Sequence, residues 1–180
     1  MKILAIGAHP DDIEIFMFGF LCCCKQIGHE ISIIVATDGS LGGNNDDNKL
    51  VENRKQETQD GLNKLGIPLF LNLPDGNLRN EGVHIDIVKN SIQKIRPDLV
   101  VTHFYKDYHS DHINLSKIVK TVTGHYIPVL YCDTMMGINF LPNYYVDVTK
   151  YINDKINSIS SHVTQKPERF INLAKLMNSY

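Results

Sequence analysis

The chain has 180 residues, of which 43% are hydrophobic and 21% are charged, and its formal net charge is −2. This size suits one domain with a single core, and the near-balanced charge without a Lys/Arg-rich run argues against nucleic acid as the main partner. No apolar stretch reaches the roughly 18 residues that a membrane-spanning helix needs, so we expect no membrane insertion.

The first residues and the four cysteines indicate a cytoplasmic protein. The apolar run at residues 3–6 is too short for the core of a secretory signal. Cys22, Cys23 and Cys24 are consecutive, so on a helix they point about 100° apart and cannot converge on one metal. Together with Cys132 they form no CxxC pair. We interpret them as small buried side chains in a reducing compartment.

Strands and helices are predicted to alternate from the first residue. Short β-branched or apolar runs predict strands, and longer segments with helical periodicity predict helices. In chain order, we expect strand 2–8, helix 12–28, strand 31–37, helix 50–65, strand 68–73, helix 83–95, strand 98–104, helix 110–122, strands 129–132 and 144–148, and helices 149–162 and 168–177. The Gly-, Asn- and Asp-rich residues 40–48 predict a loop, which is either an ordinary surface loop or a lid over a site.

Repeated strand–helix–strand units predict the fold class. Parallel strands need crossover connections, and right-handed crossovers place helices on both faces of the sheet. We therefore expect an α/β protein, a Rossmann-like three-layer sandwich with a mainly parallel central sheet. Because no linker or internal repeat divides the chain, residues 1–180 are expected to form one domain. Ligands of such folds bind at the carboxyl ends of the strands.

A first polar cluster, His9-Pro10-Asp11-Asp12, directly follows the first predicted strand. Pro10 biases His9 away from helical geometry. One aspartate could simply cap the following helix, since a carboxylate near a helix N-terminus accepts backbone N–H bonds. Capping leaves the second aspartate and the histidine unexplained. The cluster also lacks the glycines of a nucleotide-binding turn, which disfavours a nucleotide-binding Rossmann protein.

A second polar cluster, His109-Ser110-Asp111-His112, follows the strand predicted at 98–104 and begins the next helix. The alternative interpretation is a solvated loop in which Ser110 or Asp111 caps the helix. His103, late in the same strand, is a candidate for supporting a site without contacting its ligand.

Taken together, the two clusters predict a metal site. A parallel sheet would place both strand ends side by side, and between them they supply imidazole and carboxylate ligands without thiolates. This donor set suits a catalytic zinc with three protein ligands and an open position for water, although iron(II) can use it too. A further carboxylate and a further histidine are available to move protons and stabilise an oxyanion, as amide hydrolysis requires.

The two motifs resemble those of the LmbE-like (PIG-L) family of zinc-dependent N-acetylglucosaminyl deacetylases. The resemblance rests on Ala8-His9-Pro10-Asp11-Asp12, followed by Glu14, and on His109-Ser110-Asp111-His112. Supporting segments are Thr37-Asp38-Gly39, Arg54 with Glu57, Leu73-Pro74-Asp75-Gly76 and Tyr145-Val146-Asp147-Val148-Thr149.

The resemblance implies a set of roles. His9, Asp12 and His112 correspond to the zinc ligands, and Asp11 corresponds to the general base that activates water. Glu14 is one position later than the glutamate that often follows the paired aspartates, and we assign it no ligand role.

The remaining implied roles concern the substrate. His109 is expected to stabilise the oxyanion or to act as the acid, and Asp111 to orient or tune a neighbouring histidine. Arg54 and Asp75 are expected to contact the sugar. The implied substrate is an N-acetylglucosamine-type sugar or its conjugate, and the oligomeric state, including a homo-oligomer, is left open.

The resemblance is weakest at the C-terminus. His162 with Thr164-Gln165 resembles a late family motif, but family members usually continue well past the position of Tyr180. Two alternatives therefore stay open: a truncated or degenerate relative that binds metal or sugar without turnover, and a zinc hydrolase that cleaves a different amide or a sugar ester.

Overall fold

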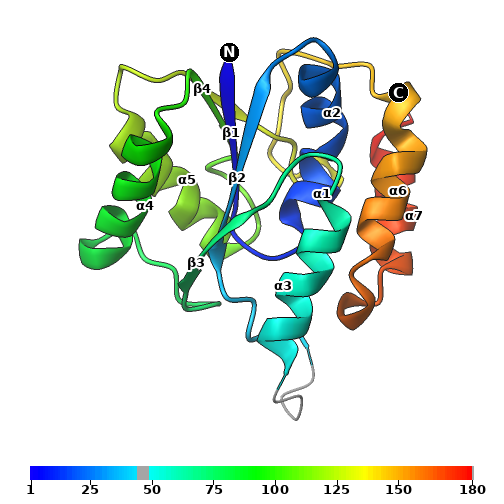
Figure 1. The fold of residues 1–180 in the computed structure, drawn as a ribbon, viewed down its shortest axis with the longest axis horizontal. Coiled ribbons are helices and arrows are strands. Elements are labelled where there is room, and N and C mark those ends of the chain that lie inside the picture. The colour runs from blue at the N-terminus through cyan, green and yellow to red at the C-terminus, as the bar shows by residue number, and fades with distance from the viewer. Residues whose placement is uncertain (44–48, 180) are drawn as a thin grey trace.

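The computed structural model describes residues 1–43 and 49–179, which form a five-stranded parallel sheet between two layers of helices (Figure 1). The strand order is β3-β2-β1-β4-β5, with every neighbouring pair parallel. The strands are β1 (Lys2–Gly7), β2 (Glu30–Thr37), β3 (Leu69–Leu73), β4 (Leu99–Thr102) and β5 (Val129–Tyr131). The predicted three-layer α/β fold is confirmed.

Two groups of helices cover the two faces of the sheet (Figure 1). One layer holds α4 (Gly82–Ile95) and α5 (Ser110–Thr123). The other holds α1 (Asp12–Phe16), α2 (Phe18–Gln26), α3 (Leu50–Gly61), α6 (Ile152–Ser160) and α7 (Glu168–Met177). Three short 3₁₀ turns complete the described chain: η1 (Met135–Gly137), η2 (Thr149–Tyr151) and η3 (Val163–Gln165).

Alternation along β1 builds a separate core on each face, because successive strand side chains point to opposite sides. Ile3 and Ala5 are buried with α1, α2 and the end of α3. Leu4 and Ile6 are buried with α4 and α5. A strand covered on both faces reads as a continuous apolar run, and this is why β1 was recognisable in the sequence.

The helix predicted at 12–28 is divided. Met17 has φ −120° and ψ −18°, outside helical geometry, and separates α1 from α2. Its N–H still donates to the carbonyl of Ile13 at 2.9 Å, and its own carbonyl accepts from Leu21, so the backbone bends without losing its hydrogen bonds. The short helix α1 thereby begins at Asp12, directly after Asp11, as an element separate from α2.

The strand predicted at 144–148 was wrong. The segment is irregular, and Tyr144 and Tyr145 are 82% and 73% exposed. It crosses α2 instead of joining the sheet: a Cβ at Gly19 would lie 2.8 Å from Val148, and the Cys23 thiol lies 3.6 Å from the carbonyl of Asp147. The segment 144–148, called the strap below, therefore lies against a helix through Asp147 and Val148.

The chain reverses its winding direction between the central strands. β1 pairs with β2 on one side and with β4 on the other, and the connections leaving β1 and β4 run to opposite faces. The carboxyl ends of β1 and β4 thus border a crevice, the usual ligand position in open α/β sheets.

Two further expectations concern the surface. Within the part of the chain that the structure describes, no helix has the length and apolar character needed to cross a membrane. The lid hypothesis for residues 40–48 falls largely on 44–48, which lie outside the described residues.

Candidate active site

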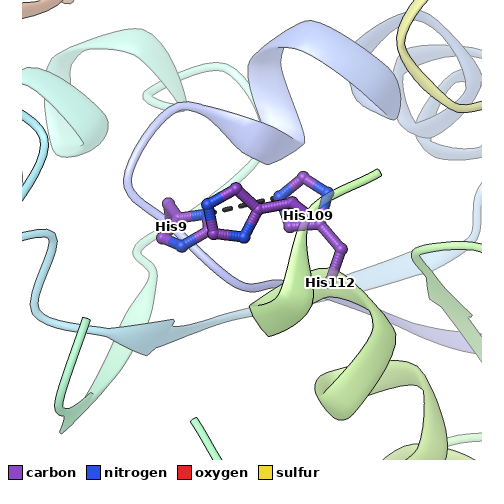
Figure 2. A group of neighbouring side chains, drawn as sticks. All are labelled: His9, His109 and His112. Carbon is purple, nitrogen blue, oxygen red and sulfur yellow. Dashed lines mark hydrogen bonds between the residues drawn. The ribbon is translucent and has the colours of Figure 1, made fainter. Parts of the chain in front are cut away.

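His9, Asp12 and His112 converge at the ends of β1 and β4. His9 Nδ1 lies 3.3 Å from His112 Nε2, a contact marked by the dashed line in Figure 2. Asp12 completes a triangle, with Oδ2 3.3 Å from His9 Nδ1 and Oδ1 3.2 Å from His112 Nε2. All three side chains are buried. Residues separated by about 100 positions thus place three ligand-type atoms together.

The dimensions of this triangle fit a metal ion. Ligand atoms about 2.0–2.1 Å from a tetrahedral zinc lie about 3.3–3.4 Å from one another. The observed separations of 3.2–3.3 Å correspond to that spacing. Within the described chain, three groups of histidine and aspartate ligand atoms lie close enough to hold a metal ion, and each of them shares His9 or His112 with the triangle. The donor set of two imidazoles and one carboxylate leaves a fourth position for water or substrate.

The outer nitrogen of His9 faces two carboxylates. His9 Nε2 lies 3.2 Å from Asp111 Oδ2 and 3.3 Å from Asp75 Oδ1. Asp111 is itself fixed, because it accepts hydrogen bonds from the backbone N–H groups of Gly76 and Leu78. A carboxylate on the outer nitrogen keeps the proton there and leaves Nδ1 free to bind a metal.

His112 has the same kind of support from Asp107. Its Nδ1 lies 3.1 Å from Asp107 Oδ2, which directs Nε2 toward His9 and Asp12. His103 packs behind: its ring stacks on His112 with centroids 3.7 Å apart, and its Nε2 lies 3.1 Å from Asp12 Oδ2. The supporting position predicted for His103 therefore corresponds to contacts with two residues of the triangle, Asp12 and His112.

The electrostatics of the cluster favour an ionised Asp12 beside a protonated His112. Burial raises the pKa of Asp12, but His112, His103 and His9 outweigh burial and hold that pKa well below its usual range. Burial lowers the pKa of His112, but Asp12 and Asp107 reverse the effect and raise it to about 9. Without a metal, the protonated rings of His9 and His112 supply the positive charge that the carboxylate requires, whereas burial and His112 lower the pKa of His103 to about 4. A divalent cation placed between them would displace those protons.

Asp11 lies beside this triangle without belonging to it. Its φ of 132° is unusual for any residue except glycine, and its side chain makes no hydrogen bond to the N-terminus of α1. Helix capping therefore does not explain Asp11. The carboxylate lines the site cavity, and Arg54 Nη2 lies 3.2 Å from its Oδ2. Strained backbone of this kind persists where the surrounding structure holds it, often at functional sites.

Arg54 is brought to the site but is already bonded there. Its Nη1 donates to the carbonyl of Gly39 at 2.8 Å, and its Nη2 donates to the carbonyl of Pro10 at 2.7 Å. Its buried Nε has no hydrogen-bond partner among the described residues. Asp75 also lines the cavity while contacting His9 and accepting from the Leu41 N–H. Arg54 and Asp75, which we expect to contact the sugar, thus line the cavity and also bond to residues of the site.

His109 caps α5 through its own ring. The backbone N–H of Asp111 donates to His109 Nδ1 at 3.2 Å, so neither Ser110 nor the Asp111 carboxylate has the capping role considered from the sequence. An accepting Nδ1 leaves the proton of the neutral ring on Nε2. Burial, with the nearby His9 and His112, lowers the pKa of His109, so the ring is neutral and able to donate from Nε2.

Sequence reasoning missed one residue of the site and one buried pairing near it. Asp107 was not singled out, although its place two residues before His109 and five before His112 was a usable signal. Glu14 and His162 also form a buried pair, with Oε1 and Nε2 2.9 Å apart. No local pattern could have revealed this pair, because 148 positions separate its members.

The site opens into a cavity of about 220 Å³. Its lining includes the triangle, Asp11 and His109, together with residues of η1 and α7. The cavity is therefore lined both by the polar groups of the site and by apolar and cationic side chains.

The chain belongs to the PIG-L family, described as GlcNAc-PI de-N-acetylase, whose model matches residues 4–123. The matched range includes every residue of the triangle, Asp11 and His109. The predicted family is therefore confirmed, and membership makes this chain an enzyme of the deacetylase class.

Two curated relatives carry deacetylase names. "Uncharacterized deacetylase YaiS" of Escherichia coli (strain K12) is 28% identical over 174 residues, covering 89% of each chain. "Diacetylchitobiose deacetylase" of Thermococcus kodakarensis is 25% identical over 190 residues, covering 93% of this chain and 71% of the relative.

The fold also occurs with a different named activity. The crystal structure of GalB, the 4-carboxy-2-hydroxymuconate hydratase from Pseudomonas putida KT2440, has a TM-score of 0.82 at 18% identity, covering 98% of this chain and 83% of GalB. The architecture alone does not determine the reaction, so the function must be argued from the site.

Proposed function

We propose that this chain is a zinc-dependent hydrolase that removes the acetyl group from an N-acetylglucosamine-type sugar or its conjugate. The observation that supports this most is the triangle of His9 Nδ1, His112 Nε2 and the Asp12 carboxylate, with separations of 3.2–3.3 Å. These three residues would hold the metal. Zinc, when bound, supplies a Lewis acid that polarises the acetamide carbonyl and makes water more acidic.

Asp11 is the proposed general base. It lines the cavity next to the triangle, and its carboxylate is available to take a proton from the attacking water. Burial raises the pKa of Asp11 to about 6, a rise that the Arg54 guanidinium opposes, so the group is a carboxylate at neutral pH. Arg54 holds the carboxylate through the 3.2 Å contact, which fixes its direction.

His109 is the proposed partner for the developing negative charge. It lies close to the triangle, with its ring centroid 4.6 Å from that of His9. The proton on its Nε2 is positioned to stabilise the oxyanion or to pass to the departing amine. Asp111 would support this arrangement by holding His9 rather than His109.

The substrate class follows from family membership together with the cavity. A volume of about 220 Å³ admits a small substrate, and Arg54 and Asp75 on its wall offer donors and acceptors for sugar hydroxyls. Zinc is proposed over iron(II) because the donor set and the spacing suit a tetrahedral site.

The test combines metal content with acetate release. We expect about one zinc per wild-type chain, and acetate release from N-acetylglucosamine or N,N′-diacetylchitobiose. Asp12→Ala and His112→Ala should lose both the metal and the activity. The matched controls are Asp86→Ala and His125→Ala, which remove the same side chains at exposed positions outside the site.

Other outcomes would identify the alternatives. If the wild-type protein is shown to be folded and still takes up no zinc, the metal assignment is overturned and a degenerate relative is favoured. Zinc binding with hydrolysis of acetylated hydroxyls but not of acetamides would overturn the N-deacetylase assignment in favour of a sugar esterase.

A further inference from the structure

Helix α7 and the loop before α5 contribute side chains to the site cavity. Arg169 and Phe170 of α7 line the cavity together with Tyr108, whose ring centroid lies 5.9 Å from that of His112. Helix α7 is held in place by packing against α6 and η1. None of these three residues has a role in the proposed chemistry at the acetyl group.

The two arginines of the cavity differ in whether their guanidinium groups are already bonded to the protein. Arg54 is buried, and its terminal nitrogens are bonded to Asp11 and to two carbonyls. Arg169 is exposed, and within residues 1–43 and 49–179 none of its nitrogens lies within 4.0 Å of a carboxylate oxygen. Arg169 is therefore a cation at the substrate cavity whose charge is not neutralised by the protein.

The guanidinium of Arg169 lies over an aromatic ring. Its Cζ lies 4.4 Å from the centroid of the Phe170 ring. A guanidinium stacked in this way keeps its N–H groups free along its edge, where they match the paired oxygens of a carboxylate or phosphate. Tyr108 adds a neutral hydroxyl to the cavity lining, since burial raises its pKa above the ordinary value while Arg169 opposes the rise.

We propose that Arg169, supported by Phe170 and Tyr108, is a specificity-determining residue that binds an anionic group of the substrate. The inference rests on the proposed deacetylation and narrows its substrate class: an N-acetylated amino sugar that carries a phosphate or carboxylate away from the acetamide.

The experiment compares matched neutral and anionic substrates. The zinc-loaded protein is assayed with the methyl glycoside of N-acetylglucosamine, with N-acetylglucosamine 1-phosphate and 6-phosphate, and with a carboxymethyl glycoside. Comparing the phosphate with the carboxylate substrates shows which anionic group is recognised. Comparing the 1-phosphate with the 6-phosphate shows at which position of the sugar it is recognised. The variants are Arg169→Gln, Arg169→Lys and, as a control, Lys175→Gln, which removes the same charge from an exposed position on α7 outside the cavity.

We expect the wild type to prefer at least one anionic substrate, and Arg169→Gln to lower the ratio of anionic to neutral kcat/KM by about tenfold. Arg169→Lys should retain part of the preference, and Lys175→Gln should retain all of it. An unchanged ratio in Arg169→Gln, or an equal fall in Lys175→Gln, would overturn the anion site.

Binding separates this inference from the proposed function. Calorimetry with N-acetylglucosamine 1-phosphate and 6-phosphate, the carboxymethyl glycoside and the methyl glycoside measures the preference without turnover. If no substrate releases acetate but an anionic sugar still binds more tightly through Arg169, the deacetylation fails and the anion site stands. If acetate is released with no preference for any anionic sugar, the deacetylation stands and the anion site fails.

Discussion

Asp11 is the residue of the site whose backbone geometry helix capping does not explain. Its positive φ, the absence of a capping bond and its place on the cavity wall distinguish it from Asp12, which accepts from the His9 N–H and belongs to the triangle. Asparagine has the same shape and tolerates positive φ better than most residues.

We predict that Asp11→Asn keeps its zinc and its fold but lowers kcat by about 10²–10⁴-fold, because the amide cannot accept the proton. The measurement is acetate release beside metal content, with Asp86→Asn as the control. Near wild-type turnover in Asp11→Asn would exclude this residue as the base.

Lys155 is a buried cation outside the active site. It is only 4% exposed, and its Nζ donates to Asn178 Oδ1 at 3.1 Å. Burial lowers the pKa of Lys155 to about 8, and the opposing influence of Cys132 and Asp133 does not compensate for it. The folded state therefore disfavours the protonated amine, which costs stability at every pH below about 8.

We predict that Lys155→Met raises the free energy of unfolding at pH 7 by about 1–3 kcal/mol. This figure is the free energy that corresponds to the lowered pKa, less the contribution of the lost hydrogen bond. The advantage should shrink as pH rises from about 8 toward 10.5, because the wild-type lysine then becomes neutral in the folded state and the penalty disappears. Urea unfolding of both proteins at pH 7 and pH 10 measures it. A gain of equal size at both pH values would show that packing, and not charge, is responsible.

At the scale of elements, the contact between α2 and the strap at 144–148 depends on one glycine. A Cβ at Gly19 would lie 2.8 Å from both Cβ and Cγ1 of Val148. Alanine is otherwise favoured over glycine within a helix by about 0.5–1 kcal/mol. Whether alanine at position 19 stabilises or destabilises the protein therefore depends on its contact with the strap.

We predict that Gly19→Ala lowers the free energy of unfolding by about 1–3 kcal/mol in the wild-type background. In a Val148→Gly background, the same substitution should be neutral or stabilising, because the contacting side chain is gone. Denaturant unfolding of the four proteins in this cycle gives the coupling. Identical effects in both backgrounds would mean that the strap does not press on α2.

Element prediction succeeded where local pattern and environment agree. The buried parallel strands were recognised as apolar runs, and the helices by their periodicity, with ends within a few residues. The segment 144–148 has the same β-branched and aromatic composition, yet it contacts α2 and leaves Tyr144 exposed. Composition predicts a strand, but only the availability of a neighbouring sheet edge decides whether one forms.

At the scale of the whole molecule, the C-terminal part is tied to the N-terminal part through buried polar contacts. His162 pairs with Glu14 of α1, and Ser158 Oγ donates to the carbonyl of Gly61 at the end of α3. We propose that residues 1–180 act as one domain, since separating these parts would leave buried charges unpaired.

This arrangement predicts a single cooperative unfolding transition that zinc shifts upward. At a free zinc concentration of 100 times Kd, binding adds about 2.7 kcal/mol, which for a chain of this size raises Tm by about 5–10 °C. Far-ultraviolet dichroism and tyrosine fluorescence should coincide, and Asp12→Ala should show no zinc shift. Two separate transitions would contradict the single domain, and an equal shift in Asp12→Ala would place the zinc elsewhere.

The sequence by itself determined the fold class and the chemistry of the two motifs. Apolar strand runs alternating with helices allow few arrangements, and dense His/Asp clusters at strand ends are specific. Only the tertiary structure decided which atoms face one another: Asp107 against His112, Glu14 against His162, and Arg169 at the cavity. Such contacts join residues brought together by the winding of the chain, and local sequence carries no record of a partner that lies far away along it.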